Sequence, residues 1–219
     1  MSSVRKRNFQ NLLLDNFPRA IDKIPVLQWD DLKNSEYVIE ARKCYYQLGG
    51  KFANPLVSLP LWDVELEKEE KGVAIQLDEV LHFNQYREQT LRMPIYQNIK
   101  GFQVSKYLQY CQKYSHECLK AGLAGDLWTH EIAEKQFGKG EGAGQLFGKG
   151  SPAWKWRAFQ DYLQDVSSLI LPLKLIRVSV WEELMIGGKL FKLNDILLNP
   201  QEQTAKAFVQ FISRKIQSI

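Results

Sequence analysis

Apolar residues recur at three- and four-residue spacing over several stretches of the chain, the pattern of a helix with one buried face. The pattern is short over residues 8–17 and regular after Ser35, at Val38, Ala41, Tyr45 and Leu48. Two glycines end that predicted helix, because glycine readily adopts the left-handed conformation that closes helices. The same reasoning predicts further helices over 79–92 and 104–121, after Ser151-Pro152 and after Asn199-Pro200.

The period falls to two in three segments, which predicts β-strands. Residues 62–68 and 73–78 alternate on either side of the polar segment 69–72, the signature of a β-hairpin, and residues 175–181 alternate again. Strands interleaved with helices predict a mixed α/β (α+β) fold. Its central mixed sheet would contain the hairpin and be flanked by helices.

Length and composition favour a single domain with a full core. Of the 219 residues, 45% are hydrophobic and 25% are charged, which is ordinary for a globular protein. We expect a domain over 1–219, made of an N-terminal helical extension (1–34), a core (35–198) and a C-terminal helix (199–219). The longest apolar run is far shorter than the roughly 20 residues of a membrane span. No membrane partner is therefore expected.

The N-terminus and the cysteines predict a cytoplasmic protein. Only Leu12–Leu14 form an apolar segment after the basic start, which is too short for a secretory signal. Three cysteines cannot all pair, which favours reduced thiols. The net charge of +4 permits nucleic-acid binding without requiring it, because 25 acidic residues offset 29 basic ones. The oligomeric state is not predicted.

The hairpin carries the most informative polar residues. A four-residue loop over 69–72 would place Glu65 opposite Gln76 and Asp63 opposite Asp78. Three carboxylates and one amide would then share one face of two adjacent strands. The other face would be apolar, formed by Val64, Leu66, Ile75 and Leu77.

Crowded carboxylates are unfavourable unless a cation relieves their repulsion. Oxygen ligands of this kind suit magnesium or manganese, and such an ion can activate water for attack on a phosphodiester. The alternative interpretation is an acidic hairpin that faces solvent, which the charged run over 65–71 also fits.

One segment carries a resemblance to a known superfamily. Residues 75–82 read Ile-Gln-Leu-Asp-Glu-Val-Leu-His, and Arg87 and Leu91 follow on the next predicted helix. With Asp63 on the preceding strand, this segment resembles the PD-(D/E)XK nucleases, and within them the very-short-patch-repair-type endonucleases and their relatives. In those proteins a strand ends in a Glu-Leu-Asp-Gly-like motif, followed by a histidine and a helical arginine. The resemblance covers residues 36–92 well and 151–198 loosely.

The resemblance implies a restriction-endonuclease-like fold and a site formed by Glu40, Asp63, Gln76, Asp78, His82 and Arg87. It also implies magnesium or manganese, with Asp63 and Asp78 as metal ligands. Two positions depart from the superfamily pattern. Gln76 replaces a carboxylate, and Asp78 stands where most members have a lysine, so cleavage activity is the least supported part of the expectation.

Two other constellations have competing interpretations. His82 lies four residues after Asp78, which favours a role in the site, but it also fits a partly buried polar position of an apolar helix. Cys111, His116 and Cys118 resemble zinc ligands. All three fall on one predicted helix, however, and structural zinc usually takes four ligands from more than one element. Buried, metal-free cysteines are the favoured interpretation.

The glycine-rich segment 138–150 predicts a long irregular loop. It is no phosphate-binding loop of the Walker type, since Gly150 takes the place of the serine or threonine. Lys149, Lys155 and Arg157 lie beside aromatic residues, which suits contacts with a nucleic-acid backbone. The alternative is that these cations only flank a loop and a buried helix stripe.

Two functions follow from the sequence. The first is a metal-dependent nucleic-acid phosphodiesterase, with DNA favoured over RNA as the partner. The second is a non-catalytic nucleic-acid or protein binding module that keeps a degenerate nuclease fold. Cleavage that requires magnesium separates the two.

Overall fold

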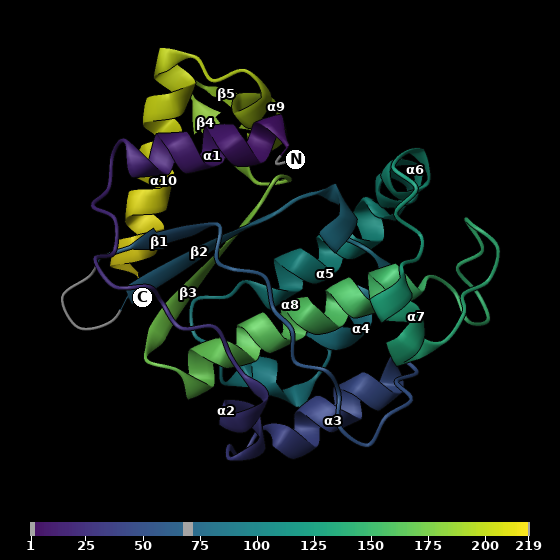
Figure 1. Cartoon of the computed structure of the whole chain (residues 1–219). Coiled ribbons are helices and arrows are strands. Elements are labelled where there is room, and N and C mark those ends of the chain that lie inside the picture. The colour runs from purple at the N-terminus through teal and green to yellow at the C-terminus, as the bar shows by residue number, and fades with distance from the viewer. Residues whose placement is uncertain (1–2, 68–71, 219) are drawn as a thin grey trace.

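A computed structural model describes residues 3–67 and 72–218 and shows a mixed α+β fold (Figure 1). Its elements in chain order are α1 (Val4–Leu14), α2 (Trp29–Lys33), α3 (Val38–Gln47), β1 (Val64–Leu66), β2 (Gly72–Asp78), η1 (Val80–His82), α4 (Gln85–Leu91), η2 (Pro94–Gln97), α5 (Val104–Lys113), α6 (Ser115–Ala124), α7 (Glu131–Phe137), α8 (Pro152–Ile170), β3 (Leu173–Ser179), β4 (Glu183–Ile186), β5 (Lys189–Lys192), α9 (Leu193–Leu198) and α10 (Glu202–Gln217).

The main sheet has three strands in the order β1-β2-β3. β1 and β2 are antiparallel and form the predicted hairpin, while β2 and β3 are parallel. The mixed sheet is therefore confirmed. The strand predicted over 175–181 is present, although it begins and ends two residues earlier, at Leu173–Ser179. In Figure 1, α1 and α10 lie on one side of the sheet and the long helix α8 lies on the other.

The predicted register of the hairpin is wrong by two residues. Val64 pairs with Ile75 and Glu65 pairs with Ala74, so Asp63 does not lie opposite Asp78. A shift of two residues keeps every side chain on its own face, so the hydrophobic pattern fits both registers equally well. Of the predicted turn, residues 69–71 lie outside the described part of the chain and Gly72 begins β2.

Two predicted helices are each broken by a local cap. The segment 79–92 forms η1 and then α4, because the Asn84 side chain accepts hydrogen bonds from the backbone N–H groups of Tyr86 (2.9 Å) and Arg87 (3.1 Å) and starts a new helix. The segment 104–121 divides at Tyr114, which separates α5 from α6.

The central helix α8 begins as predicted. The Ser151 hydroxyl accepts from the Trp154 backbone N–H (3.2 Å), and Pro152 occupies the first turn. Most of the helix is buried, including Phe159 and Leu163 of the predicted apolar stripe. Several short elements were not predicted, because four to seven residues carry too little periodicity: α2, α7, α9, β4 and β5.

The two ends of the chain pack together as part of the core. Phe9 of α1 and Phe208 of α10 are fully buried, with ring centroids 5.8 Å apart. The predicted N-terminal extension therefore contributes to the core, through Phe9 and Leu13. Among the described helices, none has the length and apolar character needed to cross a membrane.

Candidate functional site

Charged side chains from four elements and η1 meet in the interior of the protein. Their side chains are between 1% and 4% exposed, except for a histidine at 13%. Burial of so many charges is costly unless they are paired. We refer to this group as the charge cluster, formed by Asp78, His82, Arg87, Asp161, Asp165 and Arg177.

Backbone pairing explains how these residues meet. In the parallel pairing of β2 and β3, Arg177 lies opposite Gln76. Gln76 and Asp78 are two residues apart on β2, so the side chains of Asp78 and Arg177 lie on the same face of the sheet. Asp161 and Asp165 are four residues apart on α8 and therefore project from the same side of that helix. The sheet thus supplies one carboxylate and one guanidinium, and α8 supplies two further carboxylates.

Arg177 is the centre of the charge cluster. Its Nη1 donates to Asp78 Oδ1 and its Nε to Asp165 Oδ1, both at 2.5 Å. Its Nη2 donates to the backbone oxygen of Asp161 (2.9 Å) and to Gln164 Oε1 (3.2 Å). The neighbouring carboxylates raise the pKa of Arg177 although burial opposes this, so the guanidinium stays charged.

Arg87 holds the second carboxylate of α8. Its Nη2 donates to Asp165 Oδ2 (2.7 Å) and its Nη1 to the Tyr96 hydroxyl oxygen (2.9 Å), whose own proton goes to Asp165 Oδ2 (2.6 Å). Both oxygens of Asp165 are thereby engaged by cations. This part of the charge cluster is a closed ion-pair network.

His82 forms the open side of the charge cluster. Its Nδ1 lies 2.9 Å from Asp161 Oδ2 and 3.5 Å from Asp78 Oδ1. An ionised carboxylate only accepts hydrogen bonds, so the proton of this contact is on Nδ1. In the neutral ring, Nε2 then keeps its lone pair. A metal ion between Asp78 and Asp161 would replace this proton on Nδ1, because Nδ1 is the ring nitrogen that faces both carboxylates.

The charges of the cluster do not balance when His82 is neutral. Three aspartates face two arginines, which leaves one negative charge. Burial raises the pKa of Asp78, against the opposing effect of Arg177 and His82. Burial alone would also raise the pKa of Asp161, but His82 and Arg177 together hold it below the usual value. A proton held within the charge cluster, or a bound cation, would balance this charge.

Asp78, His82 and Asp161 form a candidate metal site. Each offers one ligand atom, and these atoms all lie within 4.8 Å of one another. Two carboxylates and an imidazole suit a divalent ion such as manganese, zinc or iron, and magnesium when water completes its coordination. The contacts of Asp78 limit the fit: Arg177 holds Oδ1, and the Tyr107 hydroxyl donates to Oδ2 at 2.9 Å.

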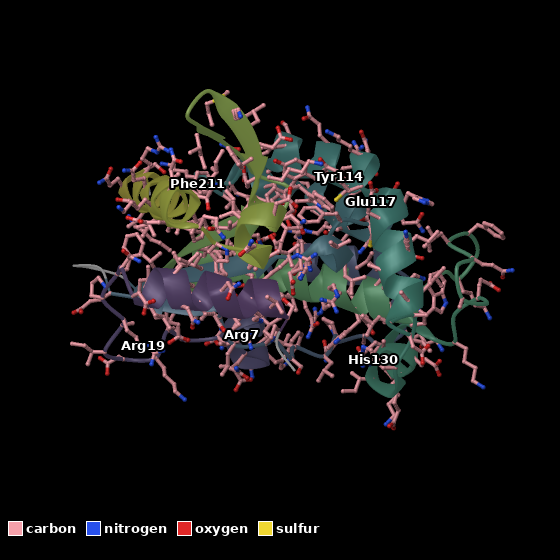
Figure 2. All side chains as sticks on the ribbon, turned by 90° about the horizontal axis from the view of Figure 1, so that it is seen from above. Arg7, Arg19, Tyr114, Glu117, His130 and Phe211 are labelled. Atoms are coloured by element: carbon pink, nitrogen blue, oxygen red, sulfur yellow. The ribbon has the colours of Figure 1, made fainter. Side chains whose placement is uncertain are left out.

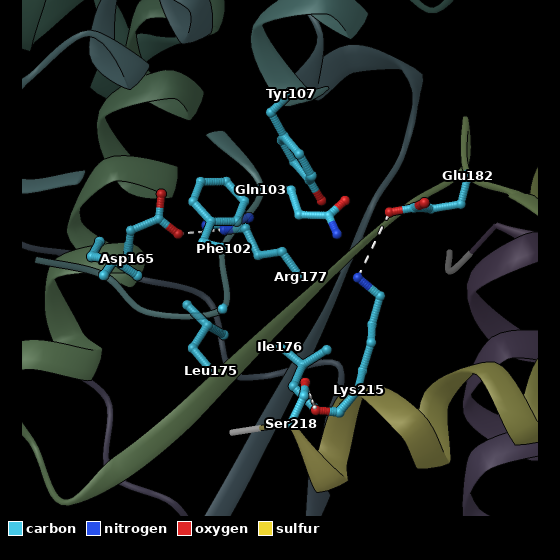
Figure 3. Close-up of a pocket in the computed structure, with 12 residues that line it drawn as sticks. Phe102, Gln103, Tyr107, Asp165, Leu175, Ile176, Arg177, Glu182, Lys215 and Ser218 are labelled. Atoms are coloured by element: carbon cyan, nitrogen blue, oxygen red, sulfur yellow. Dashed lines mark hydrogen bonds and ion pairs between the residues drawn. The ribbon is translucent and has the colours of Figure 1, made fainter. Parts of the chain in front are cut away.

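A small cavity of about 30 Å³ borders the charge cluster (Figure 3). Asp165, Arg177 and Tyr107 line one part, and Glu182 with Lys215 of α10 lines another. The space suffices for about one or two water molecules and is too small for a nucleotide. A substrate would therefore have to reach the charge cluster from the His82 side, where the only side chain of the cluster above 4% exposure lies.

Asp63 has different partners from Asp78. Its Oδ2 accepts from the Leu77 backbone N–H at 2.8 Å, and Lys6 of α1 forms an ion pair with Oδ1. Its backbone oxygen accepts from Gln10 Nε2 (2.9 Å). The two aspartates that were expected to share one ion are thus held by separate sets of residues.

Of the other residues that the resemblance implies, some lie in or beside the charge cluster and one lies apart from it. Arg87 and His82 join Asp78 in the charge cluster, the first through Asp165. Gln76 is buried on the same face of β2, and its Oε1 has no hydrogen-bond partner within the described residues. Glu40 lies apart, where its Oε1 accepts from the Ile95 backbone N–H at 2.8 Å and caps η2.

The three cations predicted to bind nucleic acid occupy different surroundings. Lys149 is exposed on the glycine-rich loop, whose ends are joined by a hydrogen bond from Glu141 N to Gly150 O (3.1 Å). Lys155 is placed over the Tyr86 ring, 5.5 Å from its centroid. Arg157 lines a separate cleft beside α7. A common surface for all three stays a prediction.

The predicted burial of the cysteines is confirmed, but Cys111 and Cys118 lie on two helices and not on the single predicted one. All three are buried and free. Cys111 belongs to α5 and Cys118 to α6, while His116 is exposed. Across residues 3–67 and 72–218, the group of three or more metal-binding side chains that the geometry brings together is the one at Asp78 and not a cysteine site.

Sequence reasoning missed Asp161, Asp165 and Arg177. A signal for the first two exists: two aspartates one turn apart, beside the apolar stripe of a mostly apolar helix, indicate a buried polar pair. Arg177 sits between Ile176 and Val178 in a strand, where a charged residue on the inner face needs a buried partner. Neither signal identifies the partner without the fold.

Comparison with known proteins gives a family but no function. A model described as a family of unknown function (DUF7255) matches residues 43–199. No curated protein and no solved structure matches the chain. The matched segment contains the whole charge cluster and Asp63, whereas Lys6 and Glu40 precede it.

Proposed function

We propose that this chain, which belongs to the DUF7255 family of unknown function, is a divalent-metal-dependent nucleic-acid phosphodiesterase. The observation that carries the proposal is the convergence of Asp78, His82 and Asp161 ligand atoms within 4.8 Å. The residual negative charge of the charge cluster gives this group a physical reason to attract a cation. The ion would be magnesium or manganese.

The resemblance to PD-(D/E)XK nucleases supports a restriction-endonuclease-like fold as part of the proposal. The order of α3, the antiparallel β1–β2 hairpin, the long helix α8 and the parallel strand β3 agrees with what the resemblance implies. Arg177 holds Asp78 from the neighbouring strand with its nitrogens all engaged inside the charge cluster, so the bound ion itself would take over the role of the lysine that the triplet lacks.

Each residue has a stated role in the proposed site. Asp78 and Asp161 would supply oxygen ligands, and His82 would supply Nδ1, the ring nitrogen that faces both carboxylates, with its proton moved to Nε2. Arg177 fixes the position of Asp78. A bound divalent ion would polarise the phosphodiester and lower the pKa of a water molecule. Because His82 is the most exposed member of the charge cluster, the phosphodiester would approach from its side.

One observation favours the second candidate, a non-catalytic module with a degenerate nuclease fold. Arg177 and Tyr107 already occupy both oxygens of Asp78, and this carboxylate is almost fully buried. If a proton on His82 balances the charge cluster, no ion is needed. The cluster would then be structural, and binding would depend on surface residues such as Lys149 and Arg157.

A cleavage assay tests the proposal. Single- and double-stranded DNA and RNA are incubated with the protein in magnesium, in manganese and in EDTA. We expect cleavage with a divalent ion, lost in Asp161→Asn and kept in Asp63→Asn, each variant checked for folding by circular dichroism. Binding without cleavage by the wild type in both metals supports the non-catalytic module. Cleavage that survives Asp161→Asn would show that the metal site lies elsewhere.

A further inference from the structure

A second cleft, lined by both apolar and polar side chains, lies where the end of α6, the start of α7 and the first turns of α8 meet. Its volume is about 360 Å³, within the range of roughly 300–1,000 Å³ that small-molecule sites occupy. None of its lining residues belongs to the charge cluster. The lining includes Asp126, Leu127, His130, Trp156, Arg157 and Gln160. We call it the Arg157 cleft.

The walls of the Arg157 cleft are fixed by hydrogen bonds. The indole Nε1 of Trp154 donates to the Leu127 backbone oxygen at 3.1 Å. The Ser151 hydroxyl and the Ala153 backbone N–H both donate to the Trp128 backbone oxygen, at 2.6 Å and 3.3 Å. The segment that follows α6 is thereby attached to the first turn of α8. A ligand would enter a preformed site and lose little affinity to ordering it.

Arg157 supplies an unengaged cation to this cleft. Within residues 3–67 and 72–218, the geometry gives its guanidinium no hydrogen bond and no ion pair. The cluster cations Arg87 and Arg177, by contrast, are both paired with aspartate. A guanidinium with free donors binds phosphate in a bidentate manner. Arg157 therefore suits an anionic ligand group.

His130 adds a second donor. Its Nδ1 accepts from the Ala133 backbone N–H at 3.3 Å and caps α7, so in the neutral ring the proton is on Nε2. Burial and the nearby Arg157 both lower the pKa of His130, which keeps the ring neutral near pH 7. His130 is exposed, and Figure 2 shows it at the edge of the molecule.

Asp126, the acidic residue that lines the Arg157 cleft, makes the cleft a poor binding site for a simple anion. Asp126 begins the connection after α6 with a positive φ of 51°, and its backbone N–H donates to the Leu123 oxygen at 3.3 Å as that helix ends. Its carboxylate accepts hydrogen bonds and repels phosphate. A ligand that carries both a phosphate group and hydroxyl or amino donors satisfies Arg157 and Asp126 together. A nucleotide has both.

We propose that the Arg157 cleft binds the phosphate group of a nucleotide, held by Arg157 and His130, while Asp126 accepts a hydrogen bond from the sugar or the base. The phosphate could belong to a free mononucleotide or to a nucleic-acid strand. In the second case the inference rests on the proposed function and extends it, because the cleft would hold the strand apart from the charge cluster.

Isothermal titration calorimetry tests the assignment with four probes: adenosine 5′-monophosphate, adenosine, inorganic phosphate and a single-stranded decanucleotide. We expect the monophosphate to bind at least about tenfold more tightly than adenosine, since a charge-assisted hydrogen bond contributes about that much. The affinity for the monophosphate should also be higher than the affinity for inorganic phosphate. A decanucleotide that binds more tightly than the monophosphate identifies a strand as the source, and the reverse order identifies a free nucleotide.

Three variants locate the binding. Arg157→Gln should weaken binding of the monophosphate about tenfold or more, and Arg157→Lys should weaken this binding less. Asp126→Ala should weaken binding of the monophosphate, because the acceptor for the sugar or base is lost, and it should leave the affinity for inorganic phosphate unchanged or raise it, because a repelling charge is removed. Lys135→Gln is the matched control on α7, where the lysine pairs with Glu131 at the surface, and it should have no effect.

Failure of this inference is distinguishable from failure of the proposed function. Absence of binding of both the monophosphate and the decanucleotide at millimolar concentration would overturn it, as would an unchanged affinity in a folded Arg157→Gln variant. Asp161→Asn, which removes a proposed metal ligand, should still bind the monophosphate with wild-type affinity. Loss of binding in that variant alone would place the phosphate in the charge cluster and also contradict the inference.

Discussion

Asp63 and Asp78 lie on the two strands of one hairpin and serve in very different surroundings. Asp63 has one cation, Lys6, whose side chain is 35% exposed. Asp78 is surrounded by Arg177, His82 and Tyr107. The contrast shows that the ion-pair and hydrogen-bond partners of a carboxylate depend on the helices and strands packed against its own strand. The alternating pattern of the strands alone does not identify those partners.

The difference follows from the register and from the helices that cover the sheet. With Val64 opposite Ile75, Asp63 is two residues short of Asp78 along the ladder. α1 brings Lys6 to the first aspartate, whereas α8 brings Asp161 and Asp165 to the second. We therefore expect substitutions around Asp78 to affect both stability and ion binding, and those around Asp63 to affect mainly local structure.

The largest expected effect is that of Arg177→Met. This change leaves Asp78 and Asp165 buried without their central cation, and breaking a buried pair in this way costs about 3–5 kcal/mol. Lys6→Met is the matched change at Asp63, whose carboxylate is also buried but keeps the hydrogen bond from the Leu77 backbone N–H, so the loss should be smaller, about 1–3 kcal/mol. Urea unfolding of both variants checks the contrast. Equal losses would show that the two aspartates are in equivalent environments.

A smaller effect is expected for Tyr107→Phe. It removes the hydroxyl that donates to Asp78 Oδ2 and leaves a buried carboxylate oxygen without a partner, at a cost of about 1–3 kcal/mol. Gln10→Ala removes the half-buried contact to the Asp63 backbone oxygen, and about 0.5–1.5 kcal/mol is typical for such a bond. Thermal unfolding should therefore rank Tyr107→Phe as the more harmful. The opposite ranking would contradict the account of Asp78.

The smallest expected effect concerns the thiols, which report on how tightly the helices beside the charge cluster pack. Burial raises the pKa of Cys111 and of Cys118 to about 12 and raises that of Cys44 as well. At pH 8 a thiol reagent should label none of the three in the native protein and all three after unfolding. Rapid labelling of Cys111 in the native state would show that this region opens.

The sequence predicted the elements better than their pairing. The hairpin over Val64–Asp78, the start of α8 at Ser151-Pro152 and the buried cysteines all have local signals, namely alternation, a cap and an apolar seam. The charge cluster has only a partial local signal, the two aspartates one turn apart on α8, because packing joins residues from positions 78 to 177. The hairpin register also depends on β3, which fixes seven positions of β2 and is nearly 100 residues away.

The predicted site residues were likewise brought together only in part. Asp78, His82 and Arg87 were placed together by resemblance, and the structure brings all three into the charge cluster. Asp63 and Glu40 were placed with them, yet each is held by other groups. Asp161 could not be assigned from the sequence, since a buried aspartate on a helix has no partner until the sheet is positioned.

Manganese binding by isothermal titration calorimetry tests the central claim most directly, because it measures the ion site without requiring a substrate. The wild type should bind one manganese ion per chain, Asp161→Asn should abolish binding, and Asp63→Asn should bind as the wild type does. Circular dichroism confirms that both variants are folded. Manganese binding that survives Asp161→Asn and is lost in Asp63→Asn would contradict the account and place the ion at Asp63.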